Sequence, residues 1–505
     1  MSFTAVPLDC PLRLGLPEDF AAIRNFFRQA HFDDATLCRV LQIGGMTDFG
    51  RVRWEELQLD LLSASLRWSL NIFARGLQAG EAESRTLCGE KVFAALNAVG
   101  LLRPAKKNPG GVLCPVWVYP VDGFVMASDR REDPEGDPFN PPADVVFPAI
   151  YPGTLRFLQL IPEARGGDAL DHCGGSGIGA LRLARTAHAA ATADLTERST
   201  FFAEFNGRLN GVAIESLCGD LYSPVAGRRF DLICAHPPFV PSTGETMVYR
   251  DGGETGETVT RRIIEGLPAH LRPGGTAVVL CVACDTGQQT FEQRVREWLG
   301  RAGDEFDLIF GLEKVLSVME VVESMRKRGQ QIGDEAARQL HDRLHAAGTR
   351  QFVYGALYIR RCAERVVDAP VRVHLTSEGR AVDFERLLAW RHFRRQPGFS
   401  GWLAASRPQP ALRLLLTARH VVQDGELVPA EFVFSIEGGF SAALMPDAWV
   451  VPLVARLNGK RSGQEVFAEA HGADELPHGF TLEAFLGLVQ RMIEMGLLTC
   501  NHMEK

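Results

Sequence analysis

The chain has 505 residues, of which 46% are hydrophobic and 23% charged, and its 62 acidic and 54 basic side chains give a formal net charge of −8. This composition excludes a disordered, collagen-like or disulfide-framework protein, and the charge provides no overall basic field that would attract nucleic acid. No apolar stretch reaches the ~20 residues of a membrane-spanning helix, and no signal-like segment opens the sequence. We therefore expect a multi-domain cytoplasmic protein with no membrane partner.

Residues 1–142 are expected to form a helical, winged-helix-like domain. Apolar residues at spacings of three and four predict helices over 18–29, 54–77 and 89–102. A Lys-Lys-Asn-Pro-Gly-Gly turn then leads to two strands, 112–118 and 123–127, which we expect to pair. Helix, turn and β-ribbon are typical of a winged helix, which binds DNA in some proteins and docks or dimerises in others. Nucleic acid is not favoured as a partner but stays open, as does a homodimer.

The pattern of predicted elements changes after a linker rich in Asp, Glu, Pro and Gly. Over 143–365, short strands alternate with helices, which predicts a parallel sheet between helical layers. The strand candidates are 169–171, 192–194, 230–235, 275–283 and 351–359. Residues 366–505 are expected to form a C-terminal α+β domain. The segments 97–102 and 493–498 have similar sequences, so a second winged helix in this domain is an alternative.

A glycine-rich turn follows the first central strand and precedes a helix. It runs from Asp171 through Cys173 and Gly175 to Gly177. Glycines at such a turn allow backbone amides to approach a ligand at the positive end of the helix dipole, although an isolated glycine turn is often only a tight turn. His172, inside this turn, is expected to cap the loop rather than to contact a ligand.

Acidic residues end the following strands at the spacing of one strand–helix unit. Asp194 could accept hydrogen bonds from two ribose hydroxyls, and Asp220 could accept one from an adenine amino group. After the strand at 230–235 comes His236-Pro237-Pro238-Phe239. Two successive prolines fix the backbone and direct the flanking residues into the cleft. Together these strand ends predict a nucleoside-binding edge of the sheet.

At these residues the sequence resembles the class I S-adenosylmethionine-dependent methyltransferases, in the branch with an Asn/Asp-Pro-Pro-Tyr/Phe motif. The turn from Asp171 to Gly177 resembles the family's glycine motif, and His236 to Phe239 its substrate-amine motif. The segment 203–212 is also similar to a helix and Asn-Gly turn of release-factor glutamine and ribosomal-RNA guanine methyltransferases. The resemblance covers 145–365 and implies an α/β, Rossmann-like core.

The resemblance also implies the cofactor, S-adenosyl-L-methionine, with S-adenosyl-L-homocysteine as product. It implies two catalytic residues, His236 and Phe239, and no metal. Substrate contacts are expected from Pro237, Phe239, Tyr249 and Arg250, the last two on a glycine-rich loop. The implied cofactor-binding residues are Asp171, Cys173, Gly175, Gly177, Asp194, Leu195, Asp220, Leu221 and His236.

One residue departs from the family pattern. His236 stands where the family has Asn or Asp. A neutral imidazole could accept a hydrogen from the target amine, or act as a base toward a hydroxyl or ammonium group. The acidic charge and this histidine together favour N- or O-methylation of a small molecule or peptide. The alternatives are methylation of a translation factor or RNA, and an inactive regulatory protein that binds S-adenosylmethionine.

Two further patterns have structural interpretations. Arg391, Arg394 and Arg395 alternate with aromatic residues, which could grip RNA, but an amphipathic helix that packs its aromatics inward is favoured. Cys281 and Cys284 form a CxxC without a second ligand pair, which favours a buried strand end over a metal site.

Overall fold

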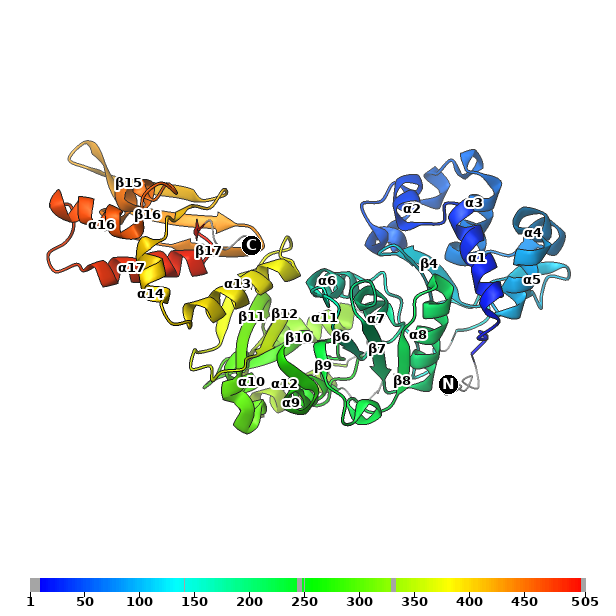
Figure 1. Ribbon diagram of the computed structural model, residues 1–505. Coiled ribbons are helices and arrows are strands. Elements are labelled where there is room, and N and C mark those ends of the chain that lie inside the picture. Colours follow the sequence, from blue (N-terminus) through cyan, green and yellow to red (C-terminus); the bar gives the residue numbers. More distant parts are fainter. Residues whose placement is uncertain (1–9, 140, 243–247, 249, 328–332, 501–505) are drawn as a thin grey trace. The chain divides into compact units, whose positions relative to one another are not determined.

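The computed structural model describes residues 10–139, 141–242, 248, 250–327 and 333–500. They form two compact units (Figure 1). The first contains the described residues up to Phe306, together with 316–352 and 361–367; the second contains 307–315, 353–360 and those from Asp368 onward. The division into 1–142, 143–365 and 366–505 stays a prediction. Within the described ranges, no helix combines the length and apolar character that crossing a membrane requires.

The first unit begins with a helical region. Its first α-helices are α1 (Pro17–Gln29), α2 (Asp34–Leu41) and α3 (Ala64–Ser69), and a π-helical turn, η4 (Leu70–Arg75), follows α3. The expected helix over 54–77 is wrong in its first half, where the chain forms the short 3-10 turns η2 (Trp54–Glu56) and η3 (Leu59–Leu61). Regular helix starts only after Ser63, whose hydroxyl accepts the Leu66 amide as an N-cap.

A small three-stranded antiparallel sheet follows, in the order β1-β3-β2. Its strands are β1 (Ala79–Gly80), β2 (Arg103–Pro104) and β3 (Gly111–Leu113), and α4 (Glu81–Cys88) and α5 (Glu90–Ala98) lie between β1 and β2 in sequence. The winged-helix-like character of this region and of the C-terminal one stays a prediction.

The expected strand 112–118 is interrupted. Pro115 lacks an amide hydrogen and cannot continue a ladder, so β3 ends at Leu113. A separate hairpin then forms from β4 (Trp117–Val121) and β5 (Phe124–Ser128), which pair only with each other.

The Rossmann-type core expected from the sequence is present. Parallel strands β10-β9-β6-β7-β8 are neighbours in that order. Numbered along the chain, this order reads 5-4-1-2-3, so the order reverses between β6 and β9, where open parallel sheets bind ligands at their carboxyl edge. The bounds are β6 (Asp168–His172), β7 (Ala189–Asp194), β8 (Glu215–Cys218), β9 (Phe230–Ala235) and β10 (Leu271–Thr286).

Helices lie before, between and after these strands in sequence. They are α6 (Pro152–Leu160), α7 (Ile178–Leu183), α8 (Glu197–Asn210), α9 (Thr258–His270) and α10 (Phe291–Trp298), and later in the unit come α11 (Val318–Lys327) and α12 (Asp334–Ala346). Helix α8 is buried along most of its length because it also packs against the helical region. There Phe205 meets Phe20 of α1 edge-on, with ring centroids 5.3 Å apart.

The second unit continues with strands in the order β12-β11-β13-β17-β16-β15. Only the ends of β11 and β12 belong to the first unit. The elements longer than two residues are β11 (Phe306–Leu316), β12 (Thr349–Arg361), β13 (Val371–Leu375), α13 (Ala381–Arg394), α14 (Phe399–Ala405), β15 (Leu415–Gln423), β16 (Glu426–Glu437), β17 (Phe440–Leu444), α15 (Val450–Arg456), α16 (Gly463–Gly472) and α17 (Leu482–Glu494).

The arginines of α13 and its end pair with buried or half-buried acids of this unit. Arg391 and Arg395 each lie 2.8 Å from Asp307, and Arg394 lies 2.9 Å from Asp368. The amphipathic-helix interpretation is thus confirmed, since these cations serve internal ion pairs.

Candidate active site

The glycine turn connects β6 to α7 through left-handed backbone. Cys173, Gly175 and Gly177 have φ of 57°, 52° and 82°, and Gly177 is the N-cap of α7. A Cβ on Gly174 would lie 1.8 Å from the Thr192 hydroxyl oxygen. Such an overlap would displace the turn from β7, so this close approach requires glycine.

Asp171 lies beneath the turn. Its side chain is buried and accepts a hydrogen bond from the Ala180 amide at 3.1 Å. Burial raises the pKa of Asp171 to about 8, with a further contribution from the charge of Asp194. The carboxyl therefore holds the first turn of α7 in place from below.

Asp194 ends β7 with its side chain turned toward the glycine turn. One carboxylate oxygen accepts the Gly175 amide at 2.9 Å and the other accepts the Thr196 amide at 3.2 Å. Burial raises its pKa. A Cβ on Gly175 would meet nothing within 4 Å, so open space borders the turn beside this carboxylate. The next residue, Leu195, has 58% of its surface exposed.

Asp220 lies after β8 and is exposed. Both carboxylate oxygens accept hydrogen bonds from Arg262 of α9, at 3.1 and 2.6 Å. The next residue, Leu221, has left-handed backbone with φ of 48°. The expected adenine contact of Asp220 stays a prediction, and it would share the carboxylate with Arg262.

His236 follows β9 at the same edge, because Ala235 pairs with His172 in the neighbouring parallel strand. Its ring centroid lies 5.5 Å from that of Phe157, which stacks on it, and 5.9 Å from that of Phe239. Burial lowers the pKa of His236 to about 4. The imidazole is therefore neutral near pH 7 and able to accept a hydrogen bond.

The aromatic wall on one side of His236 is Phe157 of α6, a residue that the sequence reasoning did not single out. Gly153 and Phe157 are four residues apart and so share a helix face. A Cβ on Gly153 would lie 3.5 Å from the His236 ring, at ordinary contact distance, so this turn of α6 lies against the imidazole. This spacing after Pro152 is the sequence signal that could have identified the wall.

The segment after Pro237 and Phe239 doubles back on itself. The Val240 amide donates to the Arg250 carbonyl at 2.8 Å, and the Gly252 amide donates to the Val240 carbonyl at 2.9 Å. Arg250 therefore belongs to the base of the loop that follows the proline motif, and its expected substrate contact stays a prediction. Tyr249, the other predicted contact, lies outside the described residues.

A buried ion pair anchors the end of this loop. Glu257 accepts hydrogen bonds from Arg294 at 3.0 and 2.9 Å and from the Cys284 amide at 2.9 Å. The preceding residue, Gly256, would place a Cβ 2.5 Å from the Phe239 carbonyl oxygen. The anchor thus fixes the chain that packs directly on Phe239.

His172 does not cap the loop as expected. Its ring is fully buried, and neither nitrogen has a hydrogen-bond partner in the described structure. The ring packs edge-on against Tyr222 at 4.3 Å, and burial lowers its pKa to about 3. In the described structure, His172 therefore packs as an apolar side chain would.

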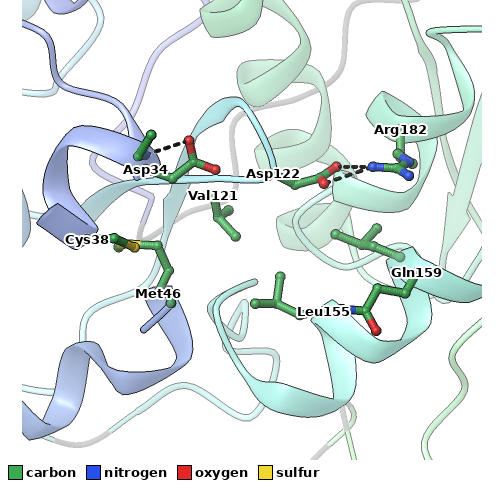
Figure 2. A pocket seen from close by; sticks show the side chains of 11 residues that line it. Asp34, Cys38, Met46, Val121, Asp122, Leu155, Gln159 and Arg182 are labelled. Carbon is green, nitrogen blue, oxygen red and sulfur yellow. Dashed lines mark hydrogen bonds and ion pairs between the residues drawn. The ribbon is translucent and has the colours of Figure 1, made fainter. Parts of the chain in front are cut away.

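A cavity of about 340 Å³ lies beside α6 (Figure 2). Leu155, Leu158 and Gln159 line it from α6, and Met46 and Val121 are among the residues that line it from the helical region. Helix α6 is thus shared by this cavity and the wall of the candidate active site.

The comparisons agree with this fold and strand-end arrangement. Residues 148–300 match the family model of the methyltransferase small domain. The chain therefore contains a class I methyltransferase domain, and the match indicates S-adenosylmethionine as its cofactor. The open side of Gly175 beside Asp194 fits a bound nucleoside.

Known relatives carry related names. A ribosomal protein uL3 glutamine methyltransferase of Bradyrhizobium diazoefficiens is 30% identical over 200 residues, 35% of this chain and 59% of the relative. A release factor glutamine methyltransferase of Geobacter sulfurreducens is 29% identical over 24% of this chain and 47% of the relative. A ribosomal RNA small subunit methyltransferase C of Alcanivorax borkumensis is 28% identical over 26% and 40%. The chain spans about half the length of the curated relatives it matches.

Among solved structures, a Thermus thermophilus 16S rRNA N2 G1207 methyltransferase in complex with AdoMet and guanosine is 18% identical. The match covers 46% of this chain and 60% of that one, with a TM-score of 0.26.

The expectation of a small-molecule or peptide acceptor is wrong. The acceptors named for the relatives are a ribosomal protein, release factors and ribosomal RNA, all macromolecules. The net charge misled because it averages over the whole chain and does not describe a local docking surface. The identity of residue 236 is no guide to the size of the molecule that carries the methylated atom.

Proposed function

We propose that this chain is an S-adenosylmethionine-dependent methyltransferase that acts on a side-chain amide of a protein of the translation apparatus. The observation that carries the proposal is the shared edge of β6, β7 and β9, with Asp194 on the Gly175 amide and His236 after the neighbouring strand. The glutamine acceptors named for two relatives support the amide. Such an acceptor also implies action in the cytoplasm.

The bound cofactor would supply a methyl group on a positively charged sulfur. Asp194 and the Gly175 turn would hold its nucleoside, and Asp194 has lone pairs beyond the two that accept backbone amides. The chain's remaining task is to bring an acceptor nitrogen close and to aim it.

His236 would orient that nitrogen rather than deprotonate it. With a pKa of about 4 the imidazole is too weak a base to retain a proton near pH 7, but its unprotonated nitrogen accepts an N–H. The rings of Phe157 and Phe239, both near the imidazole, would suit a planar amide.

The test is transfer of labelled methyl from S-adenosylmethionine into a cell extract, with Asp194→Ala as the inactive control. We expect protease-sensitive, RNase-resistant label that peptide mass spectrometry assigns to a glutamine. Label confined to metabolites would refute the proposal, as would cofactor binding without transfer, which is the behaviour of a regulatory protein.

Ribosomal RNA is the second candidate acceptor, since one relative is named for it. In that case the same assay gives RNase-sensitive label, and the protein-amide proposal is wrong.

A further inference from the structure

Two asparagines of α8 bind the β4–β5 hairpin through their side chains. Asn206 and Asn210 are one turn apart and so share a helix face. The Asn206 amide exchanges two hydrogen bonds with the Ala127 backbone, at 2.7 and 2.9 Å, and Asn210 does the same with Val125, at 2.9 and 2.7 Å. Val125 and Ala127 alternate along β5, so both present their backbone groups on one edge. The amides thus take the place of a neighbouring strand.

Only Asn206 also reaches the glycine turn. Its side-chain nitrogen donates a second hydrogen bond, to the Ser176 carbonyl at 2.9 Å. Asn206 is fully buried and Ser176 nearly so, which prevents water from replacing this bond. Ser176 lies between Gly175, whose amide donates to Asp194, and Gly177, the N-cap of α7.

From this arrangement we propose that Asn206 is a positioning residue that couples the β4–β5 hairpin to the cofactor-binding turn. The inference rests on the proposed function and extends it. Holding the Ser176 carbonyl keeps the turn in the left-handed path that presents the Gly175 amide to Asp194. Because coupling between two sites is reciprocal, binding the cofactor would also steady the hairpin.

The hairpin region has other attachments to the methyltransferase core. Arg198 of α8 lies 2.5 Å from Asp129 in a buried ion pair, and Arg182 of α7 donates to Asp122 at 2.8 and 3.0 Å. Removing the Asn206 amide therefore leaves the hairpin docked and removes its link to the turn.

Asn210→Ala is the matched control for Asn206→Ala. Both variants lose the paired bonds to one residue of β5, but only Asn206→Ala loses the bond to Ser176. A buried hydrogen bond left unmade changes an equilibrium constant by about tenfold. We therefore expect Asn206→Ala to weaken S-adenosylmethionine binding at least about tenfold in calorimetry, and Asn210→Ala to change it less than about threefold.

Hydrogen exchange supplies a second measurement, made on the wild-type chain and on both variants. We expect S-adenosylmethionine to slow exchange of the Val125 and Ala127 amides, and Asn206→Ala, but not Asn210→Ala, to abolish the effect at the remaining hairpin amides. Equal binding by both variants, or unchanged exchange in cofactor-saturated wild type, would overturn the inference. Failure of wild type to bind the cofactor would instead overturn the proposed function, and this inference with it.

Discussion

The open side of Gly175 offers a sharp test of where the cofactor lies. Gly175→Ala adds a methyl group that meets nothing within 4 Å in the protein, in a backbone with φ of 52°. A left-handed non-glycine residue costs about 1–2 kcal/mol, so the variant should fold with modestly reduced stability. If the cofactor packs against this turn, the added methyl overlaps it. Overpacking by one group costs about 1–3 kcal/mol, or about 5- to 150-fold in affinity.

Gly166→Ala is the matched control. Gly166 also has left-handed backbone, with φ of 80°, and no atom within 4 Å of an added Cβ, but it precedes the amino end of β6. Calorimetric titration with S-adenosylmethionine and thermal denaturation should therefore give two variants of similar stability, of which only Gly175→Ala binds weakly. Wild-type affinity in Gly175→Ala, or equal losses in both, would refute the assignment of the turn as the cofactor site.

Three other outcomes are expected. Arg294→Ala leaves Glu257 buried without its ion-pair partner, which should lower the free energy of unfolding by about 3–5 kcal/mol in chemical denaturation. A decrease of less than about 1 kcal/mol would show that this ion pair is not needed to anchor the loop. If His236 orients the acceptor, His236→Asn should retain methyl transfer while His236→Ala loses about 10²-fold or more of kcat. Loss of activity in both variants would instead indicate that His236 acts as a base. Because burial lowers the pKa of His236 from 6.5 to about 4, the unfolded chain binds more protons between these values, so the wild-type Tm should fall more between pH 7 and pH 5 than that of His236→Asn. An equal fall of Tm in the wild type and in His236→Asn would contradict this reasoning.

The edge of the sheet could be predicted because its signals are local. A strand, a glycine turn and a helix stand next to one another in sequence around Gly175, and the spacing of Asp194 follows from one strand–helix unit. In parallel strands the carboxyl ends meet at one edge, so the topology alone brings Asp194 and His236 to the same edge.

Features that depend on distant segments could not be predicted. Asn206 bonds to Ala127, which lies on a hairpin far upstream, and Arg262 bonds to Asp220 from a later helix. No periodicity in the sequence indicates such pairs, since they depend on how the folded elements pack. The break at Pro115 is different: its chemistry was visible in the sequence, but the apolar run around it concealed the end of β3.

The acceptor shows a further limit of this reasoning. Charge summed over 505 residues describes solubility and long-range attraction, whereas recognition of a macromolecule depends on one surface. The names of the relatives corrected the expectation that the net charge had favoured.

The most direct test of the central claim is calorimetric titration of the chain with S-adenosylmethionine, alongside Asp194→Ala. The account predicts one cofactor bound per chain, displacement by S-adenosylhomocysteine and loss of binding in Asp194→Ala. A wild-type chain that binds neither nucleoside, or a variant that binds both as tightly, would contradict it.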